Sequence, residues 1–265
     1  MRVIKIFAAA VFILLLSGCQ EFQGPAWSGD GAWVAYTVYS HAYGSLNASV
    51  YLANPDADDP APKLLAEDAA FPQFTADGSE LYFLAGRDKQ GFYTKIMRVK
   101  PGKGEPEVAL PGVRLTSMQL ATRNGSPLLL LLAGRDSSPG SLVGAELWSP
   151  ADNKRIELRA LGDMSGPAIS SNGRSIVYGM KPAEGHPILM AAEFAGGNES
   201  KAVFPTATLT EPDAASFVVI PFPSGDHFLF YGPGLKNVWV MSGKPGANKF
   251  VKYPLQFRGD LRCQL

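Results

Sequence analysis

The most reactive side chain near the amino terminus is that of Cys19, since a cysteine thiolate is a strong nucleophile. It follows a chain start that carries Arg2 and Lys5 and then runs apolar from Ile6 through Leu16. These eleven residues are too few to cross a bilayer, which takes about 20 apolar residues. A basic start, a short apolar run and small residues before a cleavage point are typical of a secretory signal peptide, predicted here at residues 1–18.

The segment Leu16-Ser17-Gly18-Cys19 resembles the lipobox of bacterial lipoproteins. The resemblance implies cleavage before Cys19, acylation of its thiol with a fatty acid such as palmitate, and contact with a membrane through that lipid. Residues 19–24 are then expected to be a short lipid tether. Gln20 stands where an Asp retains such lipoproteins in the inner membrane, so the resemblance implies an outer-membrane lipoprotein facing the periplasm, if the cell is Gram-negative.

The composition excludes several classes of function. The chain has 24 Lys and Arg against 24 Asp and Glu, so no excess of positive charge indicates a nucleic-acid partner. Only two cysteines are present, and with Cys19 assigned to lipid, Cys263 has no partner for an intramolecular disulfide.

A G-x-S-x-G elbow, an H-E-x-x-H motif and a phosphate-binding glycine loop are also missing from the sequence, so no cofactor and no metal are expected.

A repeat of about 48 residues is the main sequence signal for the fold. Its clearest copies are Pro25-Ala-Trp-Ser-Gly-Asp-Gly31, Pro72-Gln-Phe-Thr-Ala-Asp-Gly78 and Pro167-Ala-Ile-Ser-Ser-Asn-Gly173, and looser copies end at Gly125 and Gly225. Each glycine follows Asp, Asn or Ser, a pair that adopts the positive φ of a tight hairpin turn at low steric cost. An apolar strand follows each turn, then a third strand and a more polar fourth strand. The predicted second strands are Trp33–Val38, Leu81–Ala85, Leu128–Ala133, Ser175–Met180 and Phe228–Tyr231.

Four strands in each of five repeats predict an all-β fold, a five-bladed β-propeller of four-stranded antiparallel blades over residues 25–265. Strands two and three are expected between neighbouring blades, and strand four towards water. A β-sandwich with accidental periodicity is the alternative. The motif Pro-x-aromatic-Ser-x-Asp-Gly resembles the WD-like repeat of TolB-type propellers, which implies the fold and an envelope compartment.

The loops after the second strands share one face of such a propeller with the connections between blades. They carry basic residues that could form a ring for an anionic ligand or an acidic partner segment. Asp88 and Asp136 follow two of these residues and would cancel much of the field, so solvated loop charges are the alternative. The long loop Tyr39–Ser49 is the preferred contact element, because long loops over a rigid scaffold often bind partners. The candidate binding residues are Tyr39, Tyr43, Arg87, Arg135, Lys181 and Lys236.

Two functions remain open for this sequence. The first is a non-enzymatic module that binds an unidentified envelope protein or a cell-wall component. The second is a carbohydrate-active enzyme whose carboxylates Asp68, Asp163 and Asp213 act as acid and as base or nucleophile. The predicted inner strands contain no acid, which favours the binding module, and a fold alone does not imply an activity.

Overall fold

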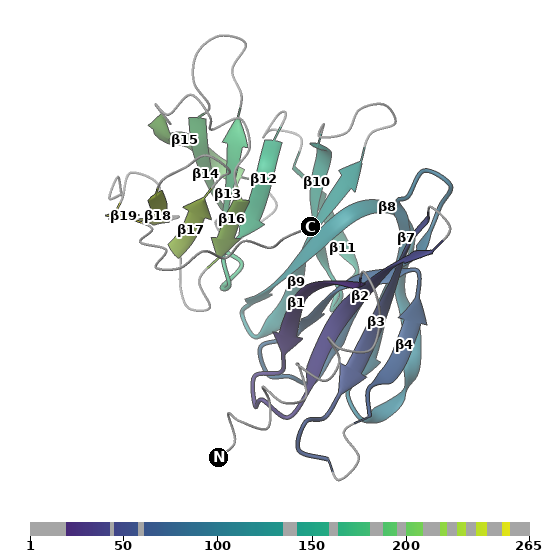
Figure 1. The fold of residues 1–265 in the computed structure, drawn as a ribbon. Coiled ribbons are helices and arrows are strands. Elements are labelled where there is room, and N and C mark those ends of the chain that lie inside the picture. Colours follow the sequence, from purple (N-terminus) through teal and green to yellow (C-terminus); the bar gives the residue numbers. More distant parts are fainter. Residues whose placement is uncertain are drawn as a thin grey trace. The chain divides into compact units, whose positions relative to one another are not determined.

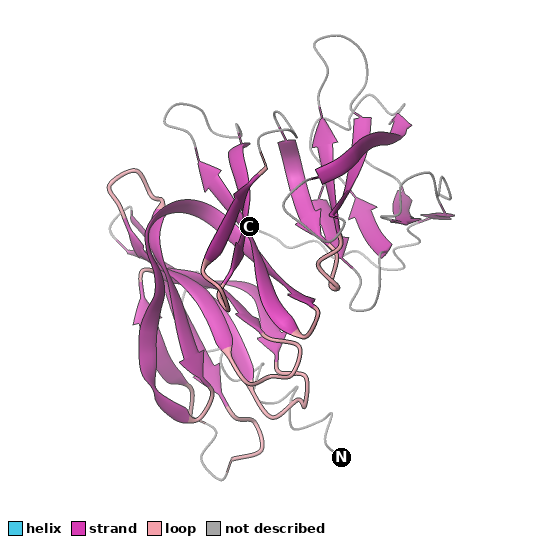
Figure 2. Ribbon diagram, turned by 180° about the vertical axis from the view of Figure 1, so that it is seen from behind, coloured by secondary structure: helices cyan, strands magenta, loops and turns pink. Residues whose placement is uncertain are grey.

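Every regular element in the described part of the chain is a β-strand. The computed structural model describes residues 20–42, 45–57, 61–134, 142–158, 164–180, 188–194, 200–208, 218–221, 227–231, 237–242 and 251–254. These residues form strands β1 to β19, drawn as magenta arrows in Figure 2, and the predicted all-β class is confirmed. No described helix is long and apolar enough to cross a membrane. The chain divides into two units, Met1–Leu120 with Leu131–Gly134 and Ala121–Leu130 with Arg135–Leu265.

The first unit begins with a four-stranded antiparallel sheet in the order β1-β2-β3-β4 (Figure 1). Its strands are β1 (Gln20–Trp27), β2 (Val34–Ala42), β3 (Ser45–Ala53) and β4 (Lys63–Glu67). The chain continues in the same up-and-down manner through β5 (Ala69–Phe74), β6 (Leu81–Arg87), β7 (Tyr93–Lys100) and β8 (Lys103–Arg123). Within each sheet every strand pairs with its neighbour along the chain, and the break between the two sheets falls between β4 and β5.

Strand β8 is 21 residues long and joins two segments that the sequence predicts as separate strands, near Glu107–Leu110 and Met118–Leu120. Its first part pairs with β7, and the hydrogen-bonded order β11-β10-β9-β8-β7-β6-β5 continues through it. The strand passes through Pro111 and Gly112 with Gly112 at a φ of 68° and with shifts in the β7–β8 register, so these residues form an irregularity within one strand.

The remaining strands follow the predicted repeat. They are β9 (Ser126–Gly134), β10 (Leu142–Ser149), β11 (Lys154–Glu157), β12 (Met164–Ile169), β13 (Ser175–Met180), β14 (Ile188–Phe194), β15 (Ser200–Thr208), β16 (Val218–Pro221), β17 (His227–Tyr231), β18 (Asn237–Ser242) and β19 (Val251–Pro254). In the second unit β12 to β15 form one four-stranded sheet in chain order, and β16 to β19 form another. The middle of β13 is fully buried, and this burial raises the pKa of Tyr178 to about 12.

The core of the first unit is built by β2, β3, β5, β6 and β7. Its buried cluster contains Ala35, Val50, Leu52, Ala69, Leu81, Phe83, Ala85, Met97 and Val99. Strand β6 is buried on both faces, since neighbouring Tyr82 and Phe83 are both 0% exposed. Two-sided burial explains its unbroken apolar sequence. In contrast, β4 is mostly exposed. The expected burial of the second strand of a repeat and the expected exposure of the fourth strand are therefore confirmed in this unit.

Three of the repeated turns share one hydrogen-bond pattern, which begins at Ser28, Thr75 and Ser170. At Thr75 the hydroxyl donates to an oxygen of Asp77 at 2.6 Å and accepts the N–H of Glu80 at 3.0 Å. The N–H of Gly78 donates to the Thr75 carbonyl at 2.8 Å, with Gly78 at a φ of 70°. Equivalent bonds surround Ser28 and Ser170. The Ser/Thr-x-Asp/Asn-Gly motif is therefore a turn in which the first and third side chains satisfy the backbone.

Neighbouring turns in the first unit also touch. A Cβ atom at Gly29 would lie 2.4 Å from the carbonyl oxygen of Ala76, and one at Gly78 would lie 3.1 Å from the Ser28 Cβ. The first of these contacts is with backbone, which has little freedom to move away. Gly29 is therefore required by close approach of the second turn.

The structure corrects the prediction of a long loop at Tyr39–Ser49. Strands β2 and β3 extend through this segment and remain paired from Tyr39 and Ala48 out to Ala42 and Ser45. Ala48 and Val50 are both fully buried and lie two residues apart, which is the period of a half-buried strand. Strand β1 likewise begins at Gln20, within the segment 19–24 expected as a tether, and pairs Gln20 with Ser40.

Candidate functional site

The sheets of the first unit have two ends that differ in structure. The turn end carries the turns at Ser28 and Thr75, together with the β7–β8 hairpin. The loop end is the opposite end, where β1 begins at Gln20, β2 leads into β3, and β6 leads into β7. The candidate binding residues and carboxylates were expected on one face of the propeller, which in the first unit corresponds to the loop end.

Three of the predicted site residues lie in the described part of the chain, and all three lie at the loop end of the first unit. They are Tyr39 on β2, Asp68 between β4 and β5, and Arg87 at the end of β6. The others fall outside the described residues: Cys19, Tyr43, Arg135, Asp163, Lys181, Asp213 and Lys236. The proposed basic ring and the proposed set of three carboxylates are therefore each represented by one residue.

Tyr93, the first residue of β7, brings these three residues together. The Arg87 Cζ lies 5.6 Å from the centre of the Tyr93 ring, and the Phe71 ring meets the same ring edge to face at 6.1 Å. The pKa of Tyr93 is raised to about 12, chiefly by burial; Tyr39 and Asp68 also raise this pKa, and Arg87 lowers it. We call Tyr39, Asp68, Phe71, Arg87 and Tyr93 the loop-end cluster.

Two members of the loop-end cluster have strained backbones. Asp68 has a φ of 47° and Phe71 a φ of 58°, a region that non-glycine residues seldom occupy and that is rarer still for bulky ones. The β5–β6 register shifts between Ala70 and Gln73, so Phe71 lies in a bulge. Bulges re-aim side chains, and this one turns the Phe71 ring onto Tyr93.

The charged side chains of the β6–β7 hairpin bond to partners within the hairpin and on β8. The Arg87 Nε donates to the Gly91 carbonyl at 3.2 Å. One oxygen of Asp88 accepts the N–H groups of Gln90 and Phe92, both at 2.9 Å. The guanidinium of Arg114 lies 3.6 Å from the other Asp88 oxygen and 4.1 Å from the centre of the Phe92 ring. Asp88 thus pairs with Arg114, and Arg87 contacts the Gly91 carbonyl and the Tyr93 ring.

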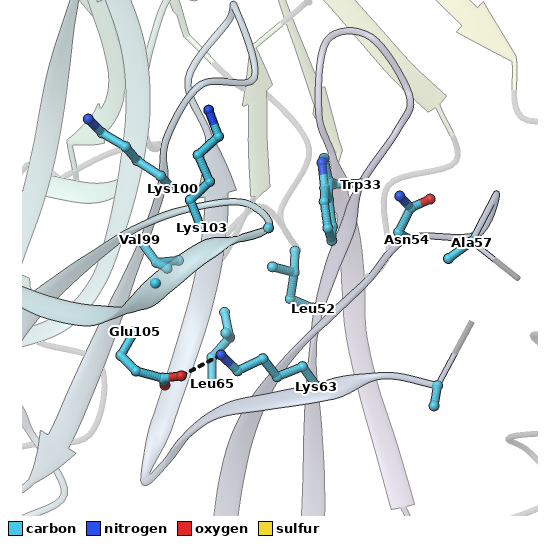
Figure 3. A pocket seen from close by; sticks show the side chains of 13 residues that line it. Trp33, Leu52, Asn54, Ala57, Lys63, Leu65, Val99, Lys100, Lys103 and Glu105 are labelled. Carbon is cyan, nitrogen blue, oxygen red and sulfur yellow. Dashed lines mark hydrogen bonds and ion pairs between the residues drawn. The ribbon is translucent and has the colours of Figure 1, made fainter. Parts of the chain in front are cut away.

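The turn end of the first unit contains a cavity of about 400 Å³ that the sequence did not indicate. Buried side chains of Leu52 and Val99 form its base with Leu65, and the half-buried indole of Trp33 forms one wall (Figure 3). Lysines surround this apolar base. We call it the Trp33 cavity, and its lining residues are Trp33, Leu52, Asn54, Ala57, Ala61, Lys63, Leu65, Val99, Lys100, Gly102, Lys103, Gly104 and Glu105.

One of the three lysines of the Trp33 cavity is neutralised. Lys63 donates to Glu105 at 2.7 Å, the dashed contact in Figure 3. Among the described residues no ion pair involves Lys100 or Lys103, and both are exposed. They also border an adjoining pocket with Asp30 and Glu80. The cavity therefore offers an apolar base beside two available ammonium groups.

The turn at Ser28 positions Trp33. The Trp33 N–H donates to the Ser28 hydroxyl at 2.9 Å, and its carbonyl accepts the Ser28 N–H at 3.0 Å. On its other side the indole packs against Gly102, where a Cβ atom would lie 2.8 Å from Trp33 Cζ2. In the matching turns Glu80 and Ser175 occupy the position of Trp33. A large aromatic residue at a position that is polar in two other copies was the available sequence signal.

Comparison with known proteins supports the fold class. No family model and no curated protein matches the chain. The TolB protein of Acinetobacter baumannii aligns over 89% of this chain and 54% of its own length, with 16% identity and a TM-score of 0.52. A putative TolB of Agrobacterium tumefaciens aligns over 88% and 80%, with 17% identity and a TM-score of 0.56.

A Pyrococcus horikoshii acylaminoacyl peptidase also shares the fold, over 85% of this chain but only 38% of its own, with 14% identity and a TM-score of 0.56. The chain thus spans about half of the first TolB and a smaller part of the peptidase. At these identities the likeness concerns the fold alone. These likenesses support a TolB-like propeller fold for the chain.

The described residues contain no group of three or more His, Cys, Asp or Glu side chains placed to hold a metal ion. Asp68, the one described member of the proposed carboxylate set, has its main-chain oxygen bonded to the Gly86 N–H at 2.9 Å. Its carboxylate acts on Tyr93 through charge. Within the part of the chain that the structure describes, Asp68 is thus a member of the loop-end cluster.

Proposed function

We propose that this protein is a lipid-anchored β-propeller of the bacterial envelope that binds a protein partner at the Trp33 cavity. The single observation that carries the proposal is an indole wall over an apolar base, with two lysines that form no ion pair among the described residues. Such a cavity suits a segment that places an apolar side chain on Trp33 and a carboxylate near Lys100 and Lys103. Aromatic anchors in desolvated pockets supply much of the energy in protein interfaces.

The residues around the cavity hold Trp33 in place, which supports a preformed binding site and not a packing defect. The turn at Ser28, the close packing on Gly102 and the buried residues Leu52 and Val99 hold the indole before any ligand arrives. A preorganised site loses little conformational entropy on binding. The TolB-like fold supports an interaction module, and the sequence resemblance to the lipobox supports the anchor.

Capture from detergent-solubilised envelope, with and without chemical cross-linking, tests the binding site. The wild-type chain should recover a defined protein, and Trp33→Ala should lose at least tenfold of it. Trp27→Ala is the matched control, because Trp27 is 43% exposed and does not line the cavity. Recovery of background proteins alone, or equal loss in both variants, would contradict the site. Retention on insoluble cell wall instead would identify a cell-wall component as the partner.

Metabolic labelling with palmitate tests the anchor separately. The wild-type chain should carry label and Cys19→Ala should carry none. Label that persists on Cys19→Ala would contradict the proposed lipid attachment.

We further propose that the five repeats close into a five-bladed ring. The five glycine turns at a period of about 48 residues support this count. Three four-stranded sheets match single blades, and the seven-stranded sheet β5–β11 matches two blades that share the long strand β8. Small-angle scattering of the mature chain should give the compact profile of a closed ring, and an extended profile would oppose it.

A further inference from the structure

The connection between the lipidated residue and the first sheet has almost no length. Gln20 is the first residue of β1, and it already pairs with Ser40 on β2. Cys19 is bonded directly to Gln20, and consecutive Cα atoms lie about 3.8 Å apart. A lipid on Cys19 would therefore hold the start of β1 within the headgroup layer of the membrane.

The topology fixes which end of the first unit follows this residue. Gln20 pairs with Ser40 near one end of β2, and Trp27 pairs with Val34 at the other. Strand β2 has nine residues and spans about 26 Å at about 3.3 Å per residue. The loop end thus lies beside the lipid, and the Trp33 cavity lies about 25 Å away along the strands.

We propose that the loop end of the first unit rests on the lipid headgroups of the membrane and that the Trp33 cavity faces away from it. This inference rests on the proposed lipid anchor. It assigns the loop end, where the sequence predicted a partner site, to a lipid surface, and leaves the turn end open to a protein partner.

The side chains of the loop end suit a headgroup layer. Arg87, Lys89 and Arg114 supply positive charge, and Phe92 and Tyr39 supply half-buried aromatic rings. Arginine and lysine stems and aromatic rings with a polar end favour the boundary between water and lipid. Asp68 and Asp88 lower the net charge of this end, so the short covalent connection has the larger role in setting orientation.

A pair of introduced cysteines reports the orientation. Gln90→Cys places an exposed thiol at the loop end, and Ser79→Cys places one at the turn end, both on loops that adjoin β6. Each is made in a Cys263→Ser background and labelled with the same fluorophore. The acylated proteins are inserted into vesicles of phosphatidylethanolamine and phosphatidylglycerol that contain a headgroup-attached nitroxide quencher.

We expect the label at residue 90 to be quenched several-fold more strongly than the label at residue 79. Equal quenching, or stronger quenching at residue 79, overturns the orientation. A melting curve of each labelled protein confirms that both variants are folded.

A tether variant tests the cause of the orientation. A Gly-Ser linker of about twenty residues inserted after Cys19 has a root-mean-square reach of about 25 Å, which frees the unit to turn. The difference between the two labels should then fall to near zero, and a difference that persists overturns the role of the short connection. Flotation of the vesicles separates the two proposals: protein that does not float refutes the anchor and the orientation together, whereas floating protein without the label difference refutes the orientation alone.

Discussion

The two ends of the first unit are built by different means. At the turn end, Ser28 and Thr75 repeat the same hydrogen bonds, and the second unit repeats them again at Ser170. At the loop end the contacts of Arg87 and Tyr93 have no counterpart among the described residues of the other repeats. A turn that recurs in several copies serves the fold. Function is therefore better sought where one copy departs from the others, as Trp33 does within an otherwise repeated turn.

Breaking the contact between the neighbouring turns should have the largest effect on the stability of the fold. Gly29→Ala brings a methyl group to 2.4 Å from the Ala76 carbonyl oxygen, and overpacking of this kind costs about 1–3 kcal/mol. We expect the melting temperature to fall by about 2–4 °C for each kcal/mol. Gly31→Ala is the control, since its φ is 72° but nothing lies within 4 Å of the added Cβ. A larger loss for Gly31→Ala would mean that strain outweighs packing here.

Removing one hydroxyl at each end compares the two ends directly. Thr75→Val leaves the Glu80 N–H without its side-chain acceptor and removes a bond to Asp77, whereas Thr94→Val at the loop end removes a single bond to the Gly86 carbonyl at 2.9 Å. Lost bonds of this kind cost about 1 kcal/mol each. Urea unfolding should show the greater destabilisation for Thr75→Val. Equal values would contradict the greater importance of the repeated turn.

The loop end should respond to alkaline pH. The pKa of Tyr93 is raised to about 12, mainly by burial, from the ordinary value of 10.0. The neutral phenol is favoured in the folded state, so its contribution is complete below pH 10.0 and is lost as the pH rises through about 12. Absorbance titration should show one late-ionising tyrosine fewer in Tyr93→Phe than in wild type. An unchanged late phase would place the effect elsewhere, for example at Tyr178, whose pKa is also raised.

The turn end should respond weakly to acid. Hydrogen bonds from the Ser28 hydroxyl and the Ala32 N–H lower the pKa of Asp30, and those from Thr75 and Ser79 lower the pKa of Asp77, both from 3.8. Their contribution is present above pH 3.8 and is lost as the pH falls through the lower folded-state values. Both carboxylates are exposed, so we expect the smallest effect here.

The double variant Asp30→Asn and Asp77→Asn tests this acid response. The fourth repeat already uses Asn172 for the same bonds, so the turns should form while the acid-dependent part of the melting temperature shrinks. An acid response identical to that of the wild type would assign it to other carboxylates.

Several features of the fold could be predicted because they depend on nearby residues. Asp-Gly and Asn-Gly pairs mark turns through local backbone preference, and the apolar run Leu81–Ala85 indicates a buried strand. The joined strand β8 and the β2–β3 hairpin were missed. In both cases small, polar or turn-forming residues lie within paired strands. The partner strand forms hydrogen bonds with their backbone, so these residues stay extended where local preference alone favours a turn.

The Trp33 cavity and the loop-end cluster could not be predicted from the sequence for a different reason. The cavity combines Trp33 with Leu65 on β4 and Lys103 on β8, and the cluster combines Tyr39 with Tyr93, residues that no local pattern connects. The contacts of Arg87 with the Gly91 carbonyl and the Tyr93 ring were likewise not indicated by the sequence. The partners of a side chain depend on how the sheets pack.

The sequence by itself determined the all-β class, the repeat and the positions of the turns in the part of the chain that the structure describes. Turn formation and strand alternation are local properties, set by backbone dihedrals and by a side-chain period of two. Only the tertiary structure decided that Trp33 borders a cavity, that Asp88 pairs with Arg114, and that β1 begins at Gln20. Each of these depends on packing between residues distant in the chain, because packing is governed by the shape and burial of whole sheets and not by the identity of neighbouring residues.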